Sequence, residues 1–110
     1  MPRPKKFRYV EDSPAVTEFA PRNRPAAGEV TMSIEELETI RLSDFEQLDQ
    51  ETAANRMQVS RHTYGRILAR ARAVAAEALV TGKALIVTGG HYRLRGRQNR
   101  CRNRGVRRQE

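Results

Sequence analysis

The sequence contains a single cysteine, Cys101, so no disulfide can form within the chain. This thiol content fits a reducing compartment. No apolar run approaches the roughly 20 residues that a membrane-spanning helix needs. The opening residues, MPRPKKFRYV, lack the apolar core of a signal peptide. We therefore expect a cytoplasmic protein that does not enter the membrane.

Side chains that carry catalysis or bind metals are also scarce. The chain has two histidines, His62 and His91, and neither has an obvious nucleophile or carboxylate partner. His91 together with Cys101 falls far short of the ligand set of a metal site. The sequence therefore indicates neither an enzyme nor a bound cofactor.

Positive charge is abundant, and it is unevenly distributed. The formal net charge is +8, and residues 93–110 hold eight arginines against one glutamate, or +7. Residues 1–92, with 13 basic and 12 acidic side chains, therefore carry only +1. Within them, residues 31–60 carry −5 and residues 61–80 carry +3. Cationic groups that displace counterions from phosphate drive association with nucleic acid, so this distribution favours a nucleic-acid-binding protein.

Length and proline content divide the chain into three parts. The 110 residues allow one domain. All five prolines lie in residues 1–30, and we predict an irregular arm there because proline cannot donate a backbone hydrogen bond. Residues 31–92 form the predicted domain, which ends in a short strand. Residues 93–110 are almost free of apolar side chains, so we predict a disordered arginine-rich tail.

Two segments have the composition of short strands. Residues 84–87 are rich in β-prone side chains, and a lone strand must pair with another. Residues 7–10 are the partner that we predict within the chain, and a strand of a second subunit is the alternative. We also expect Phe19 to anchor the arm on the helical body.

A first helix is predicted from Ser33 to about Ser43 or Asp44. Ser33 and Glu36 have the spacing of a capping box, in which each residue satisfies a free amide of the other. Apolar residues then recur at helical spacing: Ile34, Leu37, Ile40, and Leu42 or Phe45. A turn through residues 45–48 should follow.

Residues 50–69, QETAANRMQVSRHTYGRILA, have the pattern of a helix-turn-helix. Asp49 and Ser60 are placed to cap the two helices. The side chains expected to pack these helices together are Ala54, Met57, Val59, Tyr64 and Ile67. The pattern departs from the common one at Gln58, where glycine usually adopts the left-handed backbone of the turn.

The second helix of this motif is expected to run from about residue 61 to 80, with Gly82 marking its end. Its apolar stripe extends to Leu79, so its second half should pack on the first helix or on a partner chain. In helix-turn-helix proteins this helix enters the major groove of DNA. The residues that we expect to contact DNA are Gln50, Ser60, Arg61, His62, Thr63, Gly65, Arg66 and Arg70.

The roles of several of these residues stay open at this point. Arg61 or Arg66 could bond a guanine edge, and either could hold a phosphate instead. His62 could contact DNA or be a plain exposed histidine. Gly65 costs a helix about 1 kcal/mol relative to alanine. Close approach of the DNA backbone, tight packing and simple tolerance are the three explanations for it.

Four stretches of the chain resemble a family of small, functionally uncharacterised prokaryotic proteins that are expected to bind DNA. They are MPRPKK, SIEELETIRLSDFEQL, QETAANRMQVSRHTYGRIL and EALVTGKALIVTGGHY. The three predicted helices are also similar to the C-terminal promoter-reading domain of sigma factors. This resemblance implies a mainly α fold and DNA binding. The tail of residues 93–110 lies outside it.

Three functions are compatible with these features of the sequence. The first is a sequence-specific DNA-binding protein, a transcriptional regulator expected to act as a homodimer on a palindromic site. The second is an RNA-binding or non-specific nucleic-acid-binding protein driven by the arginine-rich tail. The third is an adaptor that contacts RNA polymerase or another regulator. Its contact face would be the acidic first helix with Glu35, Glu36, Glu38 and Asp44, although a solvated acidic surface is the simpler interpretation.

Overall fold

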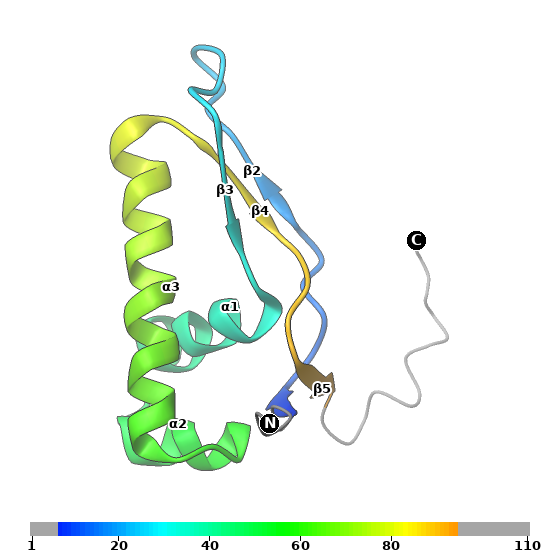
Figure 1. Cartoon of the computed structure of the whole chain (residues 1–110), viewed down its shortest axis with the longest axis vertical. Coiled ribbons are helices and arrows are strands. Elements are labelled where there is room, and N and C mark those ends of the chain that lie inside the picture. The colour runs from blue at the N-terminus through cyan, green and yellow to red at the C-terminus, as the bar shows by residue number, and fades with distance from the viewer. Residues whose placement is uncertain (1–6, 95–110) are drawn as a thin grey trace, which may run out of the picture.

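The computed structural model describes residues 7–94, and it shows a mainly α protein with five short strands in that range (Figure 1). The helical elements are α1 (Ile34–Ile40), the π-helical turn η1 (Arg41–Phe45), α2 (Gln50–Met57) and α3 (Arg61–Thr81). The strands are β1 (Arg8–Val10), β2 (Glu18–Phe19), β3 (Glu29–Met32), β4 (Ala84–Val87) and β5 (Tyr92–Leu94).

Helix α1 begins at the predicted capping box. The Ser33 hydroxyl accepts the Glu36 amide at 3.1 Å, and the Glu36 carboxylate accepts the Ser33 amide at 2.9 Å. The helix widens into η1, so helical backbone continues to Phe45. Leu42 is fully buried and closes the apolar side, whereas the Phe45 side chain is 80% exposed.

Helices α2 and α3 begin and end where the sequence predicts. Asp49 Oδ1 accepts the Thr52 amide at 2.7 Å, and the Ser60 hydroxyl accepts the Thr63 amide at 3.0 Å. Gln58 adopts the left-handed backbone, with a φ of 58°, so the turn forms without glycine. Helix α3 ends at Gly82, which is also left-handed.

A three-stranded sheet lies beside the C-terminal half of α3 (Figure 1). Strand β4 is its centre, antiparallel to β2 and parallel to β3, with Glu18 opposite Ile86 and Val30 opposite Leu85. The prediction that residues 7–10 pair with residues 84–87 is therefore wrong. Helix α3 packs on both α1 and β3, and Leu79, expected in the apolar stripe, is 84% exposed.

The arm is more regular than its proline content suggested. Strands β1, β2 and β3 all lie within residues 7–32. Pro14, Pro21 and Pro25 fall between these strands and interrupt none of them, so they separate strands instead of preventing them. Phe19 is 49% exposed within β2, so the expectation that it anchors the arm is also wrong.

The two ends of the described chain pair with each other. Strand β1 is parallel to β5, with Tyr9 opposite Arg93, and the Arg93 guanidinium lies 4.5 Å from the centre of the Phe7 ring. Arg93 and Leu94 are therefore ordered in a strand, although we placed both in a disordered tail. The rest of that tail, with Cys101, lies outside the described residues.

Tyr64 joins the helices at the centre of the core. Its side chain is fully buried, and its hydroxyl lies 2.6 Å from the Ser43 hydroxyl and donates to the Thr39 carbonyl at 3.1 Å. Burial raises the pKa of this phenol. The ring packs within a cluster that includes Leu42, Met57 and Leu68. This one side chain of α3 thus contacts both α1 and η1.

Replacing Tyr64 with phenylalanine tests this connection. The change keeps the ring and removes the hydroxyl, which leaves the buried Thr39 carbonyl without that donor. We expect Tyr64→Phe to lower the free energy of unfolding by about 1–3 kcal/mol. Tyr9→Phe is the control, because the Tyr9 hydroxyl makes no hydrogen bond within residues 7–94. Urea denaturation followed by circular dichroism measures both, and equal stabilities would contradict the prediction.

Candidate nucleic-acid interface

An open, shallow depression lies where the start of α2 meets the N-terminal half of α3. Its lining consists of Gln50, Arg61, His62, Gly65, Arg66 and Ala69. The first five are among the predicted contact residues, so the structure brings them together on one surface. Ala69 was missed, although it follows Gly65 by one helical turn and that spacing could have revealed it.

The four arginines of α3 fall into two groups. Arg70 donates from Nε to Glu36 Oε2 at 3.1 Å, and Arg72 donates to both carboxylate oxygens of Asp44 at 2.7 and 3.2 Å. The Arg72 hydrogen bond lowers the pKa of Asp44. These two arginines are paired with acidic residues of α1 and η1, and Arg70, although predicted to contact DNA, is not among the residues that line the depression.

The other two arginines, Arg61 and Arg66, face the open depression. Arg61 interacts electrostatically with Asp49, and Arg66 has no acidic partner among residues 7–94. Both side chains are exposed. The positive charge of Arg66 is therefore not compensated by the part of the chain that the structure describes.

Ser60 and Thr63 are engaged with each other. The Ser60 hydroxyl accepts the Thr63 amide and donates to the Thr63 hydroxyl at 3.0 Å. These hydrogen bonds cap α3 at its N-terminus. Neither is among the residues that line the depression.

The predicted packing residues lie between α2 and α3 and differ in how deeply they are buried. Ala54, Met57 and Tyr64 are at most 2% exposed. Val59 and Ile67 are half-buried. The Val59 amide also donates to the Ala54 carbonyl at 3.1 Å, which closes the turn between the helices. Packing and turn together hold α3 at a fixed angle to α2.

Gly65 is not required by packing within the chain. A Cβ built at this position would have one neighbour within 4 Å, Gln50 Oε1 at 3.6 Å, which is an ordinary van der Waals distance. Tight packing is thereby removed from the three explanations. Approach of a partner to the helix backbone and simple tolerance are left.

Substituting alanine at Gly65 should therefore stabilise the fold. Alanine restricts the unfolded chain and favours the helix, so we expect Gly65→Ala to raise the free energy of unfolding by about 1 kcal/mol. Gly90→Ala is the contrasting variant, because a Cβ at Gly90 would overlap Glu35 Oε1 and the backbone φ there is 111°. Urea denaturation should show opposite signs for the two variants. Destabilisation by Gly65→Ala would mean that its packing is tighter than the structure indicates.

The acidic residues of α1 are not a solvated surface. Glu35 and Glu38 are 5% and 6% exposed. Glu35 accepts from Arg8 at 3.0 Å, and Glu38 accepts two hydrogen bonds from Arg41 and one from the Glu11 amide. The Glu38 hydrogen bond raises the pKa of Arg41. The expected acidic face is therefore wrong for these two residues, which instead bind the N-terminal segment to α1.

Within residues 7–94 no three histidine, cysteine, aspartate or glutamate side chains lie close enough to bind one metal ion together. No helix in the same range is both long and apolar enough to cross a membrane.

The fold and this surface define a small, mainly α protein in which a helix pair displays exposed basic side chains. The family model described as "protein of unknown function DUF134" matches residues 1–95. The chain belongs to this family, which confirms the expected relationship to a family of small prokaryotic proteins.

Relatives from several bacteria match nearly the whole chain. A UPF0251 protein of Thermoanaerobacter sp. (strain X514) is 49% identical over 109 residues, covering 97% of this chain and 96% of the relative. One of Caldanaerobacter subterraneus subsp. tengcongensis is 49% identical over 102 residues, or 91% and 86% of the two chains. One of Moorella thermoacetica is 52% identical over 107 residues, or 96% and 72%. No solved structure matches the chain.

Proposed function

We propose that this protein binds double-stranded DNA at specific sequences and acts as a transcriptional regulator. The observation that carries the proposal is the sorting of charge on α3. Arg70 and Arg72 are each paired with an acidic side chain of the chain itself, whereas Arg61 and Arg66 face an open surface. Phosphate is the abundant anion that such an exposed basic surface attracts.

The arrangement of α2 and α3 supports a helix-turn-helix interpretation. The two helices are joined by a short turn with a left-handed residue, and small Ala54 lies buried between them. In this motif the first helix braces against the DNA backbone, and the second enters the major groove. Helix α1 packs on α3, as a leading helix does in the promoter-reading domain of sigma factors.

The residues that line the depression suggest which of them would contact phosphate and which would contact bases. Gln50 and the free amides at the start of α2 would meet phosphate. Arg61 or Arg66 would reach a base edge, and Arg pairs most often with guanine. Gly65 would let the DNA backbone approach α3 closely. His62 is exposed beside them and can donate or accept a hydrogen bond.

A dimer would give this small unit enough contact. A single module buries about 600–1,000 Å² on DNA, less than most specific complexes of whole regulators bury. Two copies related by a two-fold axis would double that area and read a palindromic site.

Selection of binding sites from random double-stranded DNA tests the proposal, using the full chain and two variants. Arg66→Ala should weaken binding to the selected site by about 1–3 kcal/mol, and preference at one base pair should relax if Arg66 reads a base. Arg72→Ala is the matched control on the same helix. Its guanidinium is held by Asp44, so affinity should stay within about twofold.

Three outcomes would count against the proposal. One is the absence of any enriched sequence. Another is an equal loss of DNA affinity in Arg66→Ala and Arg72→Ala, which would indicate non-specific attraction between charges. The third is displacement of the selected DNA by single-stranded RNA at equal concentration, which would favour RNA as the partner.

A further inference from the structure

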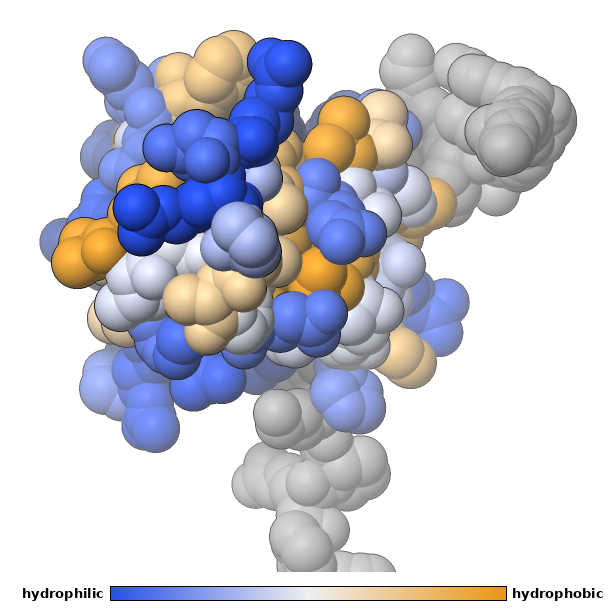
Figure 2. Space-filling model, turned by 90° about the horizontal axis from the view of Figure 1, so that it is seen from above, coloured by the Kyte–Doolittle hydropathy of each residue, from blue (hydrophilic) through white to orange (hydrophobic). Residues whose placement is uncertain are grey.

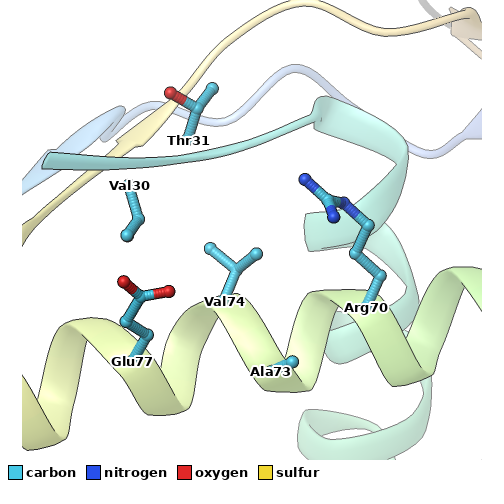
Figure 3. A pocket seen from close by; sticks show the side chains of 6 residues that line it. All are labelled: Val30, Thr31, Arg70, Ala73, Val74 and Glu77. Carbon is cyan, nitrogen blue, oxygen red and sulfur yellow. The ribbon is translucent and has the colours of Figure 1, made fainter.

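A groove runs between α3 and β3 (Figure 3), and its lining includes Val74 of the buried core. Arg70 and Glu77 extend toward it from α3, with Ala73 between them on the helix. They are seven residues apart, or about 10 Å along the helix. Arg70 uses Nε to bind Glu36, and Glu77 uses Oε2 to bind Lys83. Within residues 7–94, the terminal nitrogens of Arg70 and Oε1 of Glu77 make no hydrogen bond.

A neighbouring side of α3, which shares Ala73 with the groove, exposes apolar side chains. Ala73, Ala76 and Val80 follow one another at helical spacing, and Val80 is 84% exposed. Seen from the end of the molecule at which α3 finishes, hydrophobic residues lie at the surface between hydrophilic ones (Figure 2). A face of alanines allows a second helix to approach to about 8 Å between axes.

We propose that a second copy of this chain docks here, with the two α3 helices antiparallel across a two-fold axis between residues 73 and 74. That axis places Arg70 of each copy opposite Glu77 of the other, because 70 and 77 are equidistant from it. A parallel pair would instead put Arg70 against Arg70 and Glu77 against Glu77. The charge pattern of the groove is therefore self-complementary only in the antiparallel arrangement.

The position of this axis also fits the proposed function, on which the next step rests. The middle of residues 61–66 lies ten residues from the axis, or about 15 Å along α3. Two copies would thus hold their DNA-facing segments about 30 Å apart, close to the roughly 34 Å between half-sites one turn apart. One helix from each copy makes a small interface, and DNA that holds both copies would supplement it by raising their effective concentration.

Charge reversal tests the interface without DNA. Arg70→Glu places Glu against Glu77 of the second copy, and Glu77→Arg places Arg against its Arg70. Each variant alone should self-associate about tenfold or more weakly than the unmodified chain. The double variant Arg70→Glu/Glu77→Arg restores both pairs, and so does an equimolar mixture of the two single variants. Residues 70 and 77 are too far apart to rescue each other within one chain, so rescue requires a second copy.

Sedimentation velocity of the full chain over a range of concentrations measures this association, and circular dichroism checks that each variant folds. Ala73→Glu, at an exposed position beside the axis, is a second disruptive variant that leaves the ion pairs of Arg70 and Glu77 intact, with exposed Ala20→Glu as its control. A monomeric unmodified chain at every concentration would overturn the proposal, as would single variants that associate normally or a mixture that shows no rescue. Because mass is measured without DNA, failure of the dimer and failure of site selection remain separate results.

Discussion

The structure depends on how Tyr64 is held. Its ring fills the centre of the core, and its hydroxyl is hydrogen-bonded to Ser43 of η1 and Thr39 of α1. A buried phenol with both partners in place fixes the rotation of α3 about its own axis. The rotation decides which residues face outward. With Tyr64 inward, the next two residues, Gly65 and Arg66, turn toward the open side, so a core contact helps to determine the composition of the exposed surface.

The packing of the helices also determines where positive charge is left uncompensated. Helix α1 carries buried glutamates whose partners come from distant segments, Arg8 on β1 for Glu35 and the Glu11 amide for Glu38. Burying a carboxylate is unfavourable unless it is paired, so these contacts tie the N-terminal segment to the helical body. With the ion pairs of Arg41, Arg70 and Arg72 included, five of the seven acidic side chains of residues 31–60 are paired with arginines. The basic side chains left without compensation are therefore concentrated at the start of α3, which net charge alone does not reveal.

The sequence predicted the helices well because the capping hydrogen bonds that begin them join residues only three positions apart. Ser33 with Glu36, Asp49 with Thr52 and Ser60 with Thr63 are bonds over three positions, and all are present. The strand pairings failed because they join segments far apart. Nothing in residues 84–87 distinguishes β2 and β3 from residues 7–10 as partners. The ion pairs of Arg70 and Arg72 were missed for the same reason, since each crosses about thirty positions.

The two halves of α3 have different roles, and this difference explains the length of the helix. Reading a groove needs only its first turns, yet the helix has 21 residues. Its second half supports β3 on one side and exposes alanines and Val80 on another. A helix that continues past the site of recognition fixes the distance between that site and anything bound farther along. If the partner is a second copy, the spacing between two DNA-facing segments is set by the rise of a single rigid helix, and no flexible linker intervenes.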